Sequence, residues 1–121
     1  MTEKTKVGIA THHELRERAL QIARGERRRR LNEPKIWFTS LESFAKVLSE
    51  PNRKLLRIID ERHPSSLAEL EALTGRKASN LSRTLKTMSQ YGLVKLVPGK
   101  RGSVAPKVLV REMQMDLSIV G

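Results

Sequence analysis

Apolar residues recur three and four positions apart in five stretches of the chain, the spacing that places them on one face of an α-helix. The pattern predicts helices over residues 11–24, 40–48, 51–62, 66–74 and 78–91. Two later runs, 93–97 and 107–111, are rich in valine and leucine and flank a segment with glycine and proline, so they predict a β-hairpin with a long tip. The sequence therefore predicts a mainly α protein with one small hairpin.

Local signals mark the ends of these helices. Thr11 with Glu14, and Ser66 with Glu69, have the spacing of a capping box, in which each side chain accepts a backbone N–H bond from the other residue. Gly75 separates the last two helices, at a point where the chain needs a residue that tolerates φ > 0. The chain before Thr11 shows little pattern, and we expect it to be frayed.

The charge of the chain is large and unevenly distributed. Its 121 residues carry 24 Lys and Arg against 13 Asp and Glu, a net charge of +11. Residues 1–35 hold ten basic and five acidic residues, and residues 36–71 are close to neutral. Residues 72–111 hold nine basic residues and no acidic one. Such a segment predicts a site for a polyanion, with nucleic acid as the first choice and an anionic membrane surface as a distant second.

Several classes of function are disfavoured by what the sequence lacks. It contains no cysteine, which excludes disulfides, thiolate zinc sites and cysteine nucleophiles. Common catalytic signatures are missing, and we expect His12, His13 and His63 to be surface residues, not metal ligands. We therefore expect neither an enzyme nor a bound metal or cofactor. Without a membrane-length apolar run or a secretory leader, the chain is expected to be cytoplasmic and to make no membrane contact.

The helices over 66–74 and 78–91, joined by a glycine turn, have the layout of a helix-turn-helix. In this layout the second helix enters the major groove, and a following hairpin contacts the neighbouring backbone or the minor groove. Residues expected to read or position on bases are Ser79, Asn80, Ser82 and Arg83, with Asn80 suited to adenine and Arg83 to guanine. Residues expected to hold phosphates are Arg76, Lys77, Lys86, Lys100 and Arg101, and Thr87 shares the polar face. The opposite side of the helix carries the expected core residues Leu81, Leu85 and Met88.

The segment from Leu67 to Val94 resembles the winged helix-turn-helix of prokaryotic regulators of the ArsR and MarR type. Most of the likeness lies in Ser79-x-x-Ser82-Arg83-x-Leu85-Lys86-x-Met88-x-x-x-Gly92-Leu93-Val94, and in all it covers residues 40 to about 111. The resemblance implies a DNA-binding transcriptional regulator, most often a homodimer on a near-palindromic operator, and we expect a repressor. The chain departs from metal-sensing members in lacking cysteine, and from ligand-binding members in having little C-terminal helical material for an effector pocket.

The expected fold is a winged helix-turn-helix with an extra N-terminal helix. It has three parts, namely a basic helical arm at residues 1–35, the DNA-binding domain at 36–112 and a tail at 113–121. The run Arg27 to Arg30 fits a backbone-contacting arm, a solubilising tail or a docking site, and the sequence leaves these three open. In an alternative interpretation, the protein is an antitoxin-like interaction module that binds DNA and neutralises a partner protein. A third interpretation is binding to structured RNA.

Overall fold

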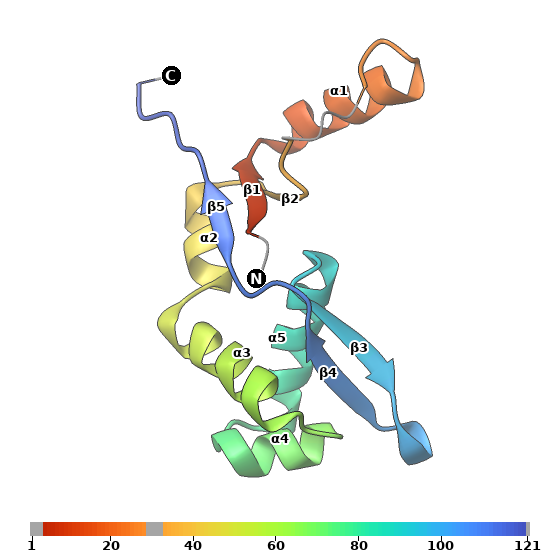
Figure 1. Ribbon diagram of the computed structural model, residues 1–121, viewed down its shortest axis with the longest axis vertical. Helices are drawn as coiled ribbons and strands as arrows, with labels where there is room; N and C mark the ends of the chain where they lie inside the picture. Colours follow the sequence, from red (N-terminus) through yellow and green to blue (C-terminus); the bar gives the residue numbers. More distant parts are fainter. Residues whose placement is uncertain (1–3, 29–32, 121) are drawn as a thin grey trace. The chain divides into compact units, whose positions relative to one another are not determined.

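The computed structural model describes residues 4–28 and 33–120, except for the side chain of Lys100. Its elements in chain order are β1 (Thr5–Ile9), α1 (His12–Ala23), β2 (Ile36–Phe38), α2 (Leu41–Val47), α3 (Glu50–Arg62), α4 (Leu67–Thr74), α5 (Ala78–Gln90), β3 (Val94–Pro98), the 3-10 turn η1 (Lys100–Gly102), β4 (Val104–Val108) and β5 (Met113–Met115) (Figure 1). The described residues thus form a mixed α/β protein with five helices and two small sheets. All five expected helices are present, each within one residue of its predicted ends. Within this described part, no helix has the length and apolar character that crossing a bilayer requires.

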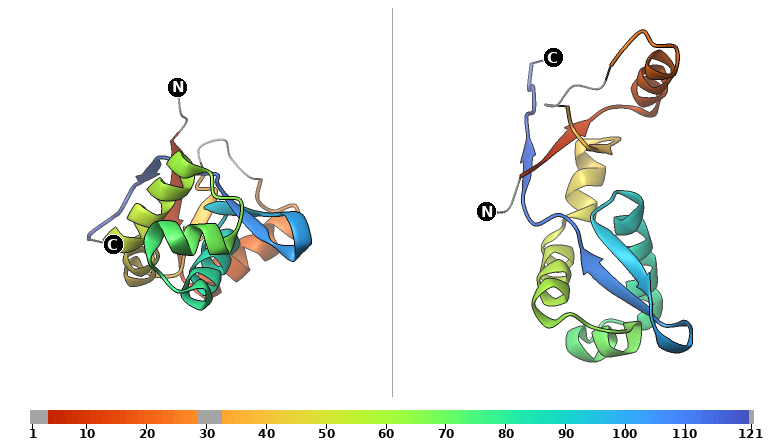
Figure 2. Two further views of the ribbon diagram at one scale, coloured as in Figure 1. Left: turned by 90° about the horizontal axis from the view of Figure 1, so that it is seen from below. Right: turned by 45° about the vertical axis from the view of Figure 1, so that its right-hand side comes forward.

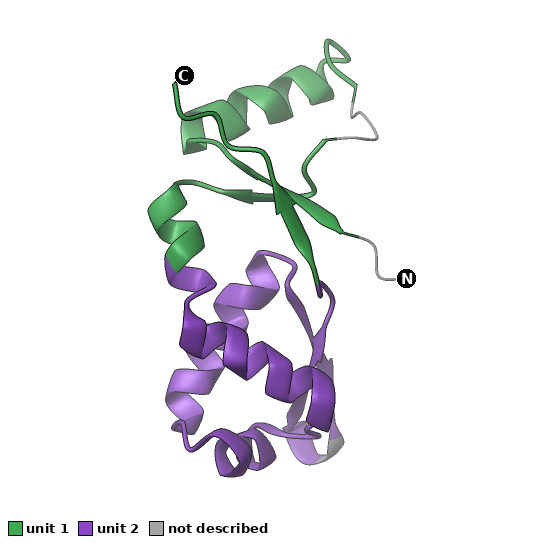
Figure 3. Ribbon diagram, turned by 60° about the vertical axis from the view of Figure 1, so that its left-hand side comes forward, with its two compact units in different colours: residues 1–45, 112–121 green, residues 46–111 purple. Residues whose placement is uncertain are grey.

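The chain divides into two compact units (Figure 3). Residues 1–45 and 112–121 form one, which we call the sheet unit, and residues 46–111 form the other, which we call the helical unit. The expected divisions were at 35/36 and 112/113. The observed division differs because the C-terminal segment returns to pair with a strand near the N-terminus, so the expected arm and tail belong to one folded unit.

The sheet unit is built on a three-stranded parallel sheet with the order β2-β1-β5. Its central strand is β1, in which Val7 lies opposite both Ile36 of β2 and Met115 of β5. The expectation of a frayed segment before Thr11 is therefore wrong for residues 5–9. Val7 and Ile9 alternate with Lys6 and Gly8, but this pattern is too short to predict a strand, and the partner strands lie far along the chain.

Aromatic packing and two ion pairs of Glu33, with Arg18 and Arg27, hold the sheet unit together. Phe38 is fully buried, and its ring meets that of Phe44 edge to face with centroids 5.1 Å apart. The Trp37 ring covers Gly8 so closely that a Cβ there would lie 2.5 Å from a ring carbon. No residue of α1 is fully buried. That helix is attached through Arg18, which pairs with Glu33 and lies 5.3 Å from the centre of the Trp37 ring.

The helical unit places three helices around one apolar core, with the β3–β4 hairpin against them (Figure 2). From α5, the expected core residues Leu81, Leu85 and Met88 are at most 1% exposed. The other two helices contribute further buried side chains, Leu55 and Ile59 of α3 and Leu70 of α4. The apolar face read from the sequence is thus confirmed as the core, and the opposite face of α5 is left to solvent.

The start of α4 differs in detail from the predicted capping box. The Glu69 N–H donates to the Ser66 hydroxyl at 3.1 Å as expected, but the Glu69 carboxylate accepts from the backbone and hydroxyl of Ser65, at 3.0 and 2.7 Å. These two bonds lower the pKa of Glu69 below its ordinary value. At the other expected capping box, Thr11 and Glu14 exchange both predicted bonds.

The hairpin is antiparallel, as predicted, and pairs Val94 with Val108 and Pro98 with Val104. Its second strand begins three residues before the predicted run because Pro106 lies inside β4, at a position where sequence reasoning expects a break. The hairpin is fastened at its base by Arg111, whose Nη2 lies 2.8 Å from Oδ1 of Asp60 on α3.

Candidate nucleic-acid interface

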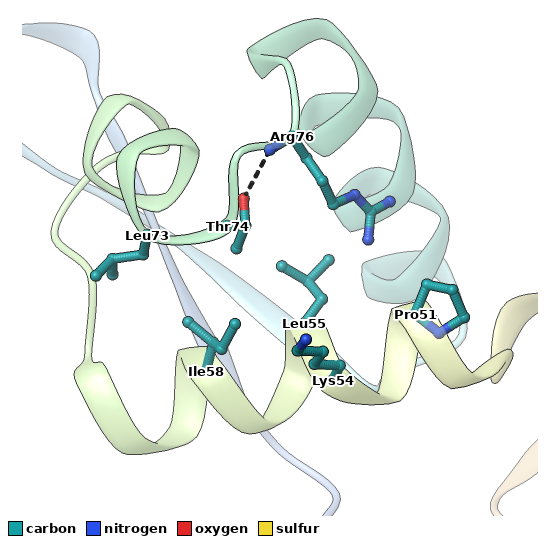
Figure 4. A pocket seen from close by; sticks show the side chains of 7 residues that line it. All are labelled: Pro51, Lys54, Leu55, Ile58, Leu73, Thr74 and Arg76. Carbon is teal, nitrogen blue, oxygen red and sulfur yellow. Dashed lines mark hydrogen bonds between the residues drawn. The ribbon is translucent and has the colours of Figure 1, made fainter.

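The turn between α4 and α5 fixes how the second helix leaves the first. The Thr74 hydroxyl donates to the carbonyl of Leu70 at 2.8 Å and accepts the N–H of Arg76 at 3.2 Å. Between them Gly75 has φ of +75°, the left-handed conformation that glycine adopts without steric cost. The Thr74 side chain therefore bonds to both sides of the turn, and Figure 4 shows its bond to Arg76.

Arg76 turns its guanidinium to the protein instead of to solvent. Nε donates to Oδ1 of Asn80 at 2.9 Å, Nη1 to Oδ1 of Asn52 at 3.2 Å, and Nη2 to Oγ1 of Thr84 at 3.2 Å. The side chain is half-buried and reaches from the turn toward α3 (Figure 4). Arg76 was expected to hold a phosphate. The structure places it as a link between the first turn of α3 and one flank of α5.

Sequence reasoning missed Asn52 and Thr84, the two other members of this link. Asn52 lies in the first turn of α3, where its N–H donates to the Ser49 hydroxyl at 3.4 Å and its amide nitrogen to the carbonyl of Val47 at 3.0 Å. An asparagine at a helix start is ordinary and predicts only a local role. Its hydrogen bond to Arg76, 24 residues further along the chain, has no counterpart in the sequence pattern.

The solvent-facing side of α5 carries the residues that the sequence assigned to DNA. Six of these residues lie within the helix and are exposed, namely Ser79, Asn80, Ser82, Arg83, Lys86 and Thr87. The N-cap residue Lys77 is exposed as well. In the described part of the chain, no carboxylate forms an ion pair with Arg83 or Lys86. The side chain of Lys77 makes no capping bond, so the positive end of the helix dipole is not screened by an acidic cap.

The tip of the hairpin presents Arg101 in a strained backbone conformation. Arg101 has φ of +56° and the following Gly102 has φ of +74°, so two left-handed residues turn the chain. The turn closes with the Gly99 N–H donating to the carbonyl of Ser103 at 2.7 Å. Arg101 is exposed, whereas the side chain of Lys100 lies outside the described residues. A non-glycine residue in this region costs about 1 kcal/mol or more, and such strain gathers at functional sites.

The basic charge is concentrated in the helical unit. Its residues 46–111 include 14 basic and five acidic residues, so this unit carries +9 of the total +11. Arg111 is paired with Asp60 and Arg76 is bonded within the protein, whereas the basic side chains of α5 and the hairpin are exposed. These exposed side chains are Lys77, Arg83, Lys86, Lys95, Arg101 and Lys107. Since β3 packs on α5, the two basic elements are neighbours and can face one polyanion together.

Two hollows lie near the Arg76 link, and both have volumes at the lower limit for small-molecule sites. The first has a volume of about 280 Å³ and is lined by Pro51, Lys54, Leu55, Ile58, Leu73, Thr74 and Arg76 (Figure 4). The second, of about 310 Å³, is lined by Lys46, Val47, Asn52, Thr84, Thr87 and Met88. Ligand pockets begin at about this size. Among the described residues, no group of three His, Asp or Glu side chains could hold a metal ion.

Comparison with known proteins yields one family. Residues 47–114 match the family model HVO_A0114, so the match covers more than half of the chain and nearly the whole helical unit. No curated protein and no solved structure matches the chain. The candidate interface on α5 and the hairpin lies within the matched residues.

Proposed function

This chain belongs to the HVO_A0114 family, and we propose that its helical unit is a winged helix-turn-helix that binds double-stranded DNA sequence-specifically. In this proposal α4 braces α5, α5 enters the major groove, and the β3–β4 hairpin acts as the wing. The protein acts as a homodimeric transcriptional regulator, most simply a repressor, in the cytoplasm. Its work is binding, with no catalytic step and no cofactor.

The observation that carries the proposal is the division of α5 into two faces. One face is the core of the unit, with Leu81, Leu85 and Met88 buried. The other exposes hydroxyl, amide and guanidinium groups at the spacing of successive helical turns, with no acidic residue in the whole helix. Hydroxyl, amide and guanidinium groups are those that pair with base edges in the major groove. The basic hairpin beside this face supplies charge for the phosphate backbone.

The proposed roles agree with the resemblance to regulators of the ArsR and MarR type. Arg83 reads a base, with guanine as its natural partner because a guanidinium donates to both O6 and N7. Lys86 and Arg101 are exposed cations that form no ion pair with a carboxylate of the described residues, and they contact phosphates. Two copies of the chain place two copies of α5 in major grooves about one helical turn apart, on an inverted repeat.

Replacement of Arg83 by alanine tests base reading. The variant should bind its preferred DNA more weakly by roughly 1–3 kcal/mol and should lose preference at one base pair of each half-site. Lys86→Ala is the matched control on the same face of the helix, and it should weaken binding to all sequences alike. Fluorescence anisotropy on the preferred duplex and its single-base variants measures both effects. Equal losses from the two variants on specific and random DNA would show that α5 does not read bases.

Replacement of Arg101 by glycine separates DNA contact from stability. Glycine removes the strain at φ of +56°, so the free energy of unfolding should stay within about 1 kcal/mol of the parent or rise. Affinity for every DNA sequence should fall, because a phosphate contact is lost. Urea unfolding and a DNA titration of the same preparation report the two quantities. If the variant keeps full affinity for DNA, the wing is not part of the DNA interface.

A further inference from the structure

We propose that Arg76 is a positioning residue that fixes the amide of Asn80 with its oxygen toward the protein and its NH₂ group toward the DNA, so that Asn80 reads an acceptor on a base edge. This inference rests on the proposed function, since it takes α5 as the element that enters the groove. It replaces two sequence expectations, a phosphate contact for Arg76 and an adenine contact for Asn80.

The direction of the Asn80 amide follows from the chemistry of its partner. A guanidinium has five N–H donors and no acceptor, so the group facing Nε of Arg76 at 2.9 Å must be the amide oxygen. The amide nitrogen then points the other way. Asn80 is exposed, and among the described residues its Nδ2 donates no hydrogen bond within the protein. This nitrogen is the free end of the side chain.

The guanidinium itself is held in place from two further sides. Asn52 accepts from Nη1 and Thr84 from Nη2, so acceptors on α3 and α5 fix the plane of the group. Asn52 is held in turn, because its own Nδ2 donates to the backbone carbonyl of Val47 at 3.0 Å. A continuous series of hydrogen bonds therefore runs from the backbone ahead of α3 to the side chain that faces outward from α5.

A fixed orientation restricts what Asn80 recognises. The bidentate pairing of asparagine with adenine uses the amide oxygen and the amide nitrogen together, the first accepting from N6 and the second donating to N7. The amide oxygen keeps a second lone pair, but Arg76 holds this oxygen toward the protein, so the group that Asn80 presents to a base is its NH₂ donor. A donor fits the acceptors of the major groove, which are purine N7, guanine O6 and thymine O4. Guanine presents two of these acceptors side by side, so it is the favoured base.

The test compares bases selected from a random duplex library by the full-length protein and two Asn80 variants. The parent should enrich guanine at the position that Asn80 faces, with a preference of about two- to tenfold, as expected for one hydrogen bond. Asn80→Ala should lose this preference. Asn80→Asp keeps an oxygen for Arg76 but presents an oxygen outward, so its preference should move to a base with a donor, such as cytosine through N4.

Variants of Arg76 distinguish positioning from phosphate contact. Arg76→Ala frees the Asn80 amide to rotate, so adenine should become acceptable at the same position while the position read by Arg83 is unchanged. Arg76→Lys should behave like Arg76→Ala, because an ammonium cannot reproduce the three-way bonding of the guanidinium. The salt dependence of binding should stay as in the parent for both variants. Lys86→Ala is the matched control, and it should lower the salt slope by about one unit and leave every base preference intact.

Two results would overturn the inference. One is a parent that prefers adenine at this position, with a preference that Asn80→Asp does not move. The other is an Arg76→Ala variant with a salt slope lower by about one unit and unchanged base preferences, which would make Arg76 a phosphate contact. The two Asn80 variants decide the first point even if Arg76→Ala does not fold. If the parent shows no base preference at any position, the proposed function itself fails, and that result differs from both.

Discussion

Affinity for DNA should fall by about 10³- to 10⁵-fold when the salt concentration rises from about 50 to 200 mM. The reason is that each phosphate neutralised by a lysine or arginine releases condensed counterions, and a dimer with about six to ten such contacts has a steep salt dependence. Each copy of the chain exposes six basic side chains on α5, at its N-cap and on the hairpin, so a dimer has twelve and can form this number of contacts. The measurement is a titration of one duplex at four or five salt concentrations. The logarithm of the binding constant is plotted against the logarithm of the salt concentration, and its slope is compared.

Two variants with the same change in charge make this experiment specific. Lys86→Ala removes an exposed cation from α5 and should lower the slope by about one unit per bound chain. Arg111→Ala also removes one positive charge, but Arg111 is paired with Asp60 at the base of the hairpin, so the slope should not change. A flat salt response of the parent would contradict phosphate binding. If the slope changed equally in both variants, DNA binding would depend on the net charge of the protein and not on a defined binding face.

The second large effect is expected in the sheet unit, where Phe38→Ala should lower the free energy of unfolding by about 3–5 kcal/mol. Phe38 is fully buried in β2 of the three-stranded sheet and meets Phe44 edge to face, so its removal leaves a cavity and ends an aromatic contact. Trp37 is the single tryptophan and lies in β2 of the same unit. Its fluorescence during urea unfolding therefore reports the sheet unit directly.

Leu41→Ala is the control for this variant. Leu41 is 44% exposed in the same unit, so its truncation should change the free energy of unfolding by no more than about 0.5 kcal/mol. If Phe38→Ala and Leu41→Ala unfold at the same urea concentration, Phe38 is not a core residue of the sheet unit.

The helical unit was predictable from the sequence because its signals are local. The apolar residues of α5 repeat at helical spacing, and Gly75 marks the turn before it, so the bounds and the buried face of this helix follow from neighbouring residues. The exposed face follows as the remainder of the same pattern. The hairpin was predicted from the two strand runs, but its second strand spans residues 104–108 instead of 107–111, because Pro106 lies within an edge strand.

The sheet unit was not predictable in the same way. Its strands β1 and β5 pair across more than 100 residues, and both are too short to show a period. Removal of residues before Ile36, a natural way to test an arm, would take away the central strand and leave β2 and β5 without their shared partner. Arg29 and Arg30 lie outside the described residues, while Arg27 lies 3.4 Å from Glu33 within the sheet unit.

The Arg76 link shows the limit of reading a site from residue types alone. A basic residue just before α5 is equally suited to a phosphate or to an internal acceptor, and the sequence favours the first because most arginines are exposed. The structure shows internal acceptors, because Asn52 accepts a hydrogen bond from Nη1 of Arg76 at 3.2 Å across 24 residues of sequence. The bond from Nε of Arg76 to Asn80 likewise depends on the folded chain.

If α5 reads DNA sequence, in vitro selection of duplexes by the purified parent protein, followed by sequencing, should yield one enriched motif made of two inverted half-sites about one helical turn apart. The motif should lose one base position in Arg83→Ala and keep every position in Lys86→Ala. A pool that stays random although the protein binds it would show that α5 does not read sequence.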